Sequence, residues 1–198
     1  MPHPAQRPGG RTAKTTSAVF DATIEELAHR AYADVSVESI AIAAGVHKTT
    51  IYRRWGSKTE LIRQALIASA ASNIDVPDTG DVERDLHSLS RSVQSLLTTD
   101  LGGAVTTSLM AGAASSPEIR DAVNDLWSTR RALMAAIVDR AVDHGQLKPG
   151  TDASRVLEAM AAPLYYRLLV AGVQPTVEDA DRSAAAAIAA ARAGVFAC

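Results

Sequence analysis

Apolar side chains recur every three or four positions along most of this chain, and this spacing predicts a succession of helices. In the first third, helices are expected over residues 15–33, 37–44 and 48–55, and a fourth from residue 57 to about residue 73. Gly45 and Gly56 follow the second and third of these segments, where a left-handed glycine ends a helix at little cost. The front of the chain therefore predicts four short helices.

The remainder predicts five more helices after a loop at 75–81. They are expected at 82–97, 104–114, 117–144, 152–171 and 176–194, with residues 100–103 read as a break. Start signals support three of them, because Ser116, Asp152 and Thr176 are residue types that cap helix N-termini, and Pro117 suits a first turn. The fold class expected is all-α, with about nine helices.

The eighth predicted helix carries a regular apolar seam. Leu157, Met160, Leu164 and Leu168 recur at intervals of three and four, and such a seam needs a partner surface. The ninth segment is rich in alanine, which lets another helix approach closely. These two helices are therefore expected to pair with their copies in a second subunit, through Leu157, Met160, Leu164, Leu168 and Ile188, forming a homodimer.

Composition narrows the function classes. Of the 198 residues, 47% are hydrophobic and 4% aromatic, and there is a single cysteine, so neither a disulfide framework nor a thiolate metal cluster is expected. No apolar run is long enough for a membrane span, and no secretory signal is recognised, which favours a cytoplasmic protein. Scattered histidines and the absence of phosphate-loop or nucleophile-elbow motifs predict no catalytic site, metal or cofactor.

Charge is unevenly distributed along the chain. The net charge is −2, but residues 1–63 carry nine basic and six acidic residues, whereas residues 64–198 carry eleven and sixteen. A basic N-terminal part followed by an acidic C-terminal part indicates that the N-terminal part binds a polyanion. Residues 1–12, with Arg7 and Arg11, are interpreted as a flexible basic arm.

The segment 36–55 has the spacing of a DNA-reading helix-turn-helix. Ala41 supplies a small residue where two helices cross, Gly45 supplies the turn, and Ile51 holds the angle. The second helix then presents Lys48, Thr49, Tyr52 and Arg53 outward, and these side chains suit base edges and phosphates. The alternative is an ordinary helical hairpin with a solvated charged face.

Three sequence blocks in order carry a resemblance. They are Ile40-Ala41-Ile42-Ala43-Ala44-Gly45-Val46, Thr50-Ile51-Tyr52-Arg53-Arg54-Trp55 and Ser57-Lys58-Thr59-Glu60-Leu61. Over about residues 13–73 the chain resembles the N-terminal domain of the TetR family of repressors. Residues 74–198 resemble, more loosely, the ligand-binding and dimerisation domain of one TetR subgroup, through Ser116-Pro117-Glu118, residues 145–149 and residues 163–170.

The resemblance implies roles for particular residues. Its DNA contacts would fall on His47, Lys48, Thr49, Thr50, Tyr52, Arg53 and Lys58, with Thr50 and Lys58 matching phosphate contacts. His47 departs from the usual capping serine at the start of the recognition helix, and Ala31 replaces a glycine often found before the tyrosine at the end of the first helix.

The function expected is a dimeric repressor that binds double-stranded operator DNA and leaves it when a small molecule binds. Candidate pocket residues are large side chains of the second domain: Met110, Trp127, Met134, Met160, Tyr165 and Tyr166. Ordinary core packing is the alternative role for these residues. Two other functions are the alternatives: a DNA-binding helical protein without a ligand, and a helical enzyme, for which the sequence shows no convergent acid, base or metal group.

Overall fold

The chain is almost entirely helical in the computed structural model, which describes residues 9–72 and 76–197. Within these ranges it forms nine α-helices, one short 3-10 helix and no strand, which confirms the all-α prediction. The elements are α1 (Gly9–His29), η1 (Tyr32–Asp34), α2 (Val37–Ala43), α3 (Lys48–Trp55), α4 (Lys58–Ser72), α5 (Val82–Thr98), α6 (Asp100–Ser115), α7 (Pro117–Asp143), α8 (Ala153–Leu169) and α9 (Val177–Ala193).

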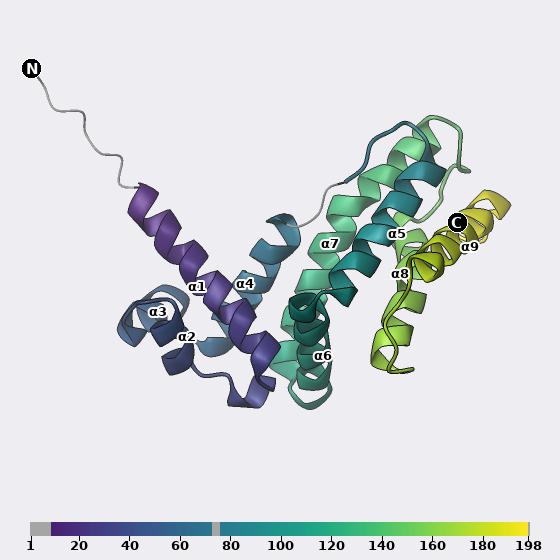
Figure 1. The fold of residues 1–198 in the computed structure, drawn as a ribbon. Helices are drawn as coiled ribbons and strands as arrows, with labels where there is room; N and C mark the ends of the chain where they lie inside the picture. Colours follow the sequence, from purple (N-terminus) through teal and green to yellow (C-terminus); the bar gives the residue numbers. More distant parts are fainter. Residues whose placement is uncertain (1–8, 73–75, 198) are drawn as a thin grey trace, which may run out of the picture.

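Helices α1 to α4 gather at one end of the molecule, and α5, α8 and α9 at the other (Figure 1). Helix α7 joins the two ends, since it packs against α4 near its beginning and against α8 further along. Helix α6 also contacts the first group, through α1 and η1, while α5 packs on α8 and α9. The second group therefore reaches the first through α6 and α7.

The three predicted N-terminal caps are present, and Ser36 caps α2 in the same way. Ser36, Ser116, Asp152 and Thr176 each accept a backbone N–H from the first turn of the helix that follows. Pro117 is the first residue of α7, where its missing N–H leaves no intrahelical bond unmade. Local hydrogen-bonding chemistry therefore sets these four helix starts.

Helix α1 is shifted towards the N-terminus relative to the prediction. It begins at Gly9, so residues 9–12 of the expected flexible arm are helical, and Arg7 lies outside the described residues. It ends at His29 rather than residue 33, because Ala31 adopts an extended conformation before η1. The Ser108 hydroxyl of α6 donates to the Arg30 carbonyl, so packing against α6 accommodates this early end.

Helix α6 begins at Asp100, where the sequence had indicated a break. Thr99 caps it, accepting the N–H of Gly102, and the two glycines lie in its first turns. A Cβ on Gly102 would collide with the Leu96 carbonyl oxygen, and one on Gly103 would lie 2.9 Å from the Leu97 carbonyl oxygen. The glycines therefore permit a close α5–α6 junction and do not end a helix.

Two large hydrophobic clusters form the core. The first unites α1–α4 with Leu109 of α6 and with Ile119, Val123 and Leu126 of α7. The second unites α5, α8 and α9 with the C-terminal half of α7. The helices that carry the helix-turn-helix thus share a continuous core with part of the second domain.

The apolar seam of α8 faces inward. Leu157, Met160, Leu164 and Ile188 are buried within a single chain, with Leu164 completely inaccessible, and Leu168 is half-buried against Leu164. The chain's own α5, α7 and α9 supply the partner that the seam requires. The expectation of a dimer interface is therefore corrected for Leu157, Met160, Leu164 and Ile188, since side chains buried inside one subunit cannot also face another; for the half-buried Leu168 it stays a prediction.

Candidate nucleic-acid interface and ligand cavity

Helices α2 and α3 form the predicted helix-turn-helix. Gly45 has a φ of +65°, and in the turn it begins the Val46 N–H donates to the Ala41 carbonyl at 2.9 Å. Ile51 and Trp55, four residues apart on α3, are buried in the first core cluster. These contacts fix one side of α3 to the protein and leave its other side free.

The free side of α3 presents polar and basic side chains. Lys48, Thr49, Tyr52 and Arg53 are exposed, as is His47 just before the helix, while Thr50 is half-buried. Tyr52 is 47% accessible to solvent, which is unusual for a large aromatic residue on a helix that packs against a core. The structure therefore brings six of the seven predicted DNA-contacting residues onto one short helix and its cap.

On this face of α3, Lys48 forms an ion pair that is largely exposed to solvent. Lys48 pairs with Glu38 of α2 at 2.9 Å, and both side chains are more than half exposed. Their hydrogen bond raises the pKa of Lys48 and lowers the pKa of Glu38. Because exposed ion pairs contribute little to stability, Lys48 can exchange Glu38 for a phosphate at small cost.

Lys58, the seventh predicted contact, starts α4 and lies against η1. Its ammonium donates to the carbonyls of Val35 at 3.0 Å and Tyr32 at 3.3 Å. The same nitrogen lies 4.4 Å from the centre of the Tyr32 ring, and partial burial lowers the pKa of Lys58. Lys58 therefore holds the backbone between α1 and α2 in place. His47 caps α3 without a side-chain hydrogen bond.

A cavity of about 270 Å³ lies between α7 and α8, with α5 and α6 at its margin. Five of the six predicted pocket residues line it: Met110, Trp127, Met134, Met160 and Tyr165. Tyr166 does not, since it is 60% exposed on the outer side of α8. Tyr166 lies about 100° further round α8 than Tyr165, and this rotation turns its side chain away from the cavity.

Aromatic and basic side chains lie together on one wall of this cavity, which is the outer of two cavities in this part of the molecule. Trp127 and Tyr165 meet edge to face, with ring centres 5.0 Å apart, and the Arg130 guanidinium lies 5.6 Å from the Trp127 ring. Burial raises the pKa of Tyr165 to about 12, although the charge and hydrogen bonding of Arg130 act in the opposite direction. Tyr165 therefore keeps its proton at physiological pH.

A second cavity of about 140 Å³ lies deeper, towards the helix-turn-helix. Ile24 of α1 and Leu66 and Ser69 of α4 form one wall, and α5, α6 and α7 supply the rest. Met110, Trp127 and Arg130 line both cavities, so these three side chains form the partition between them. A molecule in this inner cavity would contact α1 and α4, which share a core cluster with α2 and α3.

Sequence reasoning missed Arg130 as a cavity residue. It occupies a position on α7 four residues after the buried Leu126 and seven before the buried Ile137, on the apolar stripe of the helix. An arginine on such a stripe is itself a signal, because charged side chains are rarely placed towards a core without a partner. Val93, contributed by α5, carries no comparable signal in the sequence.

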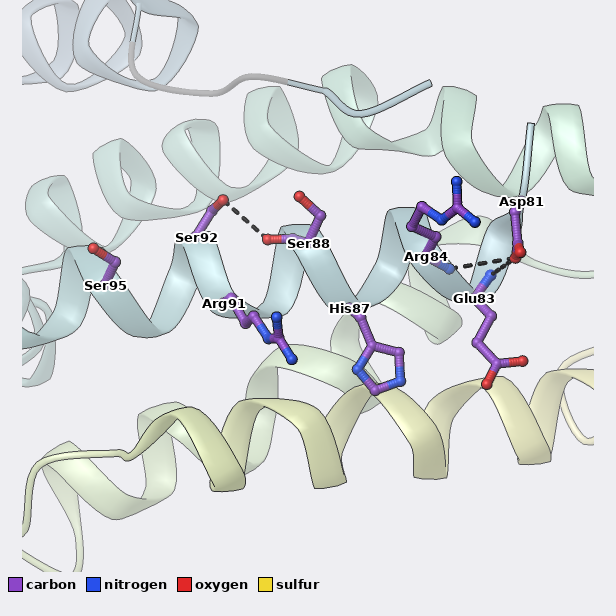
Figure 2. A pocket seen from close by; sticks show the side chains of 8 residues that line it. All are labelled: Asp81, Glu83, Arg84, His87, Ser88, Arg91, Ser92 and Ser95. Carbon is purple, nitrogen blue, oxygen red and sulfur yellow. Dashed lines mark hydrogen bonds between the residues drawn. The ribbon is translucent and has the colours of Figure 1, made fainter. Parts of the chain in front are cut away.

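A shallow polar hollow lies along the exposed side of α5 (Figure 2). Asp81 caps the helix through the N–H groups of Glu83 and Arg84, while His87 and Arg91 point towards α9. There Arg91 and His87 pair with Asp181 at 2.7 and 3.2 Å, which lowers the pKa of Asp181 to about 2. These ion pairs link α5 to α9.

Within residues 9–72 and 76–197, no group of three or more histidine, cysteine, aspartate or glutamate side chains is arranged to hold a metal ion. In the same ranges no helix has the length and apolar character needed to cross a membrane.

Comparisons with known proteins match both parts of the chain. Residues 19–65 match the family described as bacterial regulatory proteins, tetR family, and residues 76–187 match the Tetracyclin repressor-like, C-terminal domain. The second match alone spans more than half of the chain. The DNA-binding transcriptional repressor TetR of Mycobacteroides abscessus is 31% identical over 163 residues, which cover 79% of this chain and 83% of the relative.

Two further similarities agree with these matches. The HTH-type transcriptional regulator AqdR of Rhodococcus erythropolis is 29% identical over 155 residues, covering 78% of this chain and 74% of the relative. The crystal structure of the TetR family transcription regulator SCO0332 superimposes with a TM-score of 0.74 at 27% identity, covering 89% of this chain and 97% of that one.

Proposed function

Because the chain belongs to the TetR family of DNA-binding transcriptional regulators, we propose that it is a repressor that leaves its operator when a small molecule fills the cavities beside Trp127. Its family consists of regulators, which confirms the expectation that the chain is not an enzyme. The proposal adds a ligand response, a dimer surface and specific DNA contacts to that family assignment.

The exposed side of α3 supports the DNA contacts. Tyr52 and Arg53 lie about one helical turn along α3 from Lys48 and Thr49, so all four reach the same groove when α3 enters it. Arginine and lysine read guanine edges and phosphates, and the tyrosine hydroxyl donates to phosphate oxygens. His47 and Thr50, at the start of the same helix, lie where the backbone passes.

The inner cavity is the observation that carries the ligand response. Its walls come from α1 and α4 on one side and from α5, α6 and α7 on the other. A ligand that fits better when these walls separate shifts the population towards that arrangement. Operator binding requires two recognition helices about 34–36 Å apart, or at a related fixed spacing, so moving α4 in each subunit weakens it.

A DNA-binding protein without a ligand is the main alternative. It predicts a closed core in the second domain, whereas the cavity lined by Met134, Met160 and Tyr165 is open space of about 270 Å³, close to the lower end of the range of ligand pockets. The open cavity favours the ligand-responsive function. The protein then acts where its operator is, in the cytoplasm.

We place the dimer interface on the outer faces of α8 and α9. Four of the exposed large apolar side chains fall within a short stretch of this region, at Tyr166, Val170, Val173 and Val177. Ala185 and Ala189 are exposed on the neighbouring face of α9 and permit close approach of a symmetry mate. Exposed apolar patches of this kind mark association surfaces, and dimerisation is typical of the family.

The ligand response is tested with an operator selected by the full-length protein from random duplexes. Small molecules that raise the melting temperature of the protein are then added to the labelled complex, and fluorescence anisotropy measures release. We expect at least one such molecule to release the wild type, and Ala161→Phe, which places a ring in the outer cavity, to keep operator binding but resist release. If every molecule that stabilises the free protein leaves the complex intact, the ligand response is contradicted.

A further inference from the structure

Arg130 is a charge placed among apolar cavity walls without an anionic partner. Its Nε atom is buried and makes no hydrogen bond, and Arg130 takes part in no ion pair in the described part of the chain. A buried N–H donor without a hydrogen-bond partner destabilises the folded protein. The cost is larger when the donor belongs to a charged group than when it belongs to a neutral one. Such a group points to a partner that arrives from outside the chain.

The other charges at the outer cavity do not supply that partner. Arg131 and Glu158 also line it, and they pair with each other at 3.7 Å. The remaining lining side chains are apolar or aromatic, apart from the Tyr165 hydroxyl, which stays protonated and donates rather than carrying negative charge. The cavity therefore holds one uncompensated positive charge.

The position of Arg130 is fixed before any ligand binds. Its guanidinium lies 5.6 Å from the centre of the Trp127 ring, and Trp127 is held in turn by its edge-to-face contact with Tyr165. Cation–π contact of this kind orients a guanidinium without using its hydrogen-bond donors. Apart from its hydrogen bond to the Tyr165 hydroxyl, the guanidinium keeps donors available, the unpaired Nε among them, at the partition where the outer and inner cavities meet.

We infer that the ligand of these cavities is an apolar acid, whose single anionic group binds Arg130 at the partition while its apolar body occupies the cavity space on either side. The inference rests on the proposed function, because it names the chemical class of the same ligand. A planar carboxylate, or two of the three oxygens of a tetrahedral sulfonate, accepts the parallel N–H donors of a guanidinium, and the Tyr165 hydroxyl adds a further donor. Aromatic or aliphatic walls bind the remainder of the molecule.

A matched pair of fluorescent probes tests the anionic requirement in the absence of DNA. 8-Anilinonaphthalene-1-sulfonate and N-phenyl-1-naphthylamine share the same two aromatic groups and differ in the sulfonate. We expect the full-length wild type to bind the sulfonate roughly tenfold or more tightly, the range expected for one charge-assisted hydrogen bond in a low-dielectric site. Equal affinities, or failure of the sulfonate to bind at all, would overturn the inference.

Three variants locate the effect. Arg130→Met keeps a long apolar stem without the charge, and it is expected to bring the two affinities within about twofold. Arg130→Lys keeps the charge and is expected to retain part of the preference. Arg131→Gln, at the neighbouring arginine that already pairs with Glu158, is expected to keep all of it.

The outcomes separate this inference from the proposed function. A preference for the sulfonate that survives in Arg130→Met places the anion elsewhere and overturns the inference, whatever happens on DNA. An unchanged melting temperature in Arg130→Met shows that the lost preference comes from the cavity and not from unfolding. A preference that depends on Arg130, in a protein that no cavity ligand releases from its operator, upholds the acid site and contradicts the ligand response alone.

Discussion

Lys58 and Lys148 show how the same side chain serves different surroundings. Both ammonium groups donate to backbone carbonyls, Lys58 beside the helix-turn-helix and Lys148 at the C-terminal end of α9, where it meets Ala193 at 2.9 Å. An ammonium has three donors, and Lys58 uses two of them on Tyr32 and Val35. The third, at the start of α4, is what a phosphate contact requires.

Replacing Lys58 by methionine is expected to reduce the salt dependence of operator binding. Each phosphate contact contributes about 0.9 to the slope of log affinity against log salt concentration, so a dimer should lose about 2 in total. Lys148→Met is the matched control, because it removes an ammonium that also donates to a backbone carbonyl but lies far from α3. An unchanged slope in Lys58→Met would show that Lys58 serves only the protein's own carbonyls.

Tyr165 gives a pH-dependent prediction at the same scale. Its pKa is raised to about 12, so the folded protein favours the neutral phenol, and the free energy of unfolding should fall as pH rises from about 10 to about 12. Absorbance of phenolate should show one late-titrating tyrosine among the four in the chain. Tyr165→Phe should abolish that late step and Tyr166→Phe should leave it; the reverse pattern would place the wrong tyrosine in the cavity.

At the scale of helices, the sequence correctly predicted helix ends that are set by hydrogen bonds between neighbouring residues. It failed where contacts between residues far apart in the chain set the structure. Capping residues such as Ser116 and Asp152 located helix starts correctly, since the hydrogen bonds involved lie within three residues. The break predicted at Gly102 and Gly103 was wrong, because these glycines let α6 approach the end of α5. No local sequence pattern reveals that role. The sequence identified the apolar seam of α8 but assigned its packing partner to a second subunit. Periodicity shows that a face is buried, but it does not show which element covers that face.

The turn between α2 and α3 provides a test at this scale. Gly45 has a left-handed backbone and open space around its Cβ position, so a substitution there affects conformation alone. Gly45→Ala is expected to lower the free energy of unfolding by about 1–2 kcal/mol. Gly45→Asn, which tolerates the left-handed region, should lose less. Urea denaturation measures both, and equal losses would mean that the turn is not limited by its backbone conformation.

At the scale of the whole molecule, the two functions are joined by a shared core. Leu109, Ile119 and Leu126 of the second domain pack with the helices that position α3, and the inner cavity opens beside them. The sequence predicted five cavity residues as large apolar side chains, but it could not show that a second cavity touches α1 and α4. That placement depends on how whole helices cross.

The corrected dimer surface is tested by two substitutions on α8. Tyr166→Glu places a charge on the exposed apolar patch and is expected to give folded monomers with weakened operator binding. Leu164→Glu places the same charge in the core and is expected to unfold the chain instead. Sedimentation and circular dichroism distinguish these results; a Tyr166→Glu protein that remains dimeric would rule out this surface.

The central claim is that the exposed side of α3 reads the operator, and alanine substitution of Tyr52 and Arg53 tests it most directly. Each contact contributes roughly 1–3 kcal/mol and occurs twice in a dimer, so affinity for the selected operator should fall by about tenfold or more in each variant. Arg84→Ala, an equally exposed arginine on α5, should bind as the wild type does. Wild-type operator affinity in both Tyr52→Ala and Arg53→Ala would contradict the account.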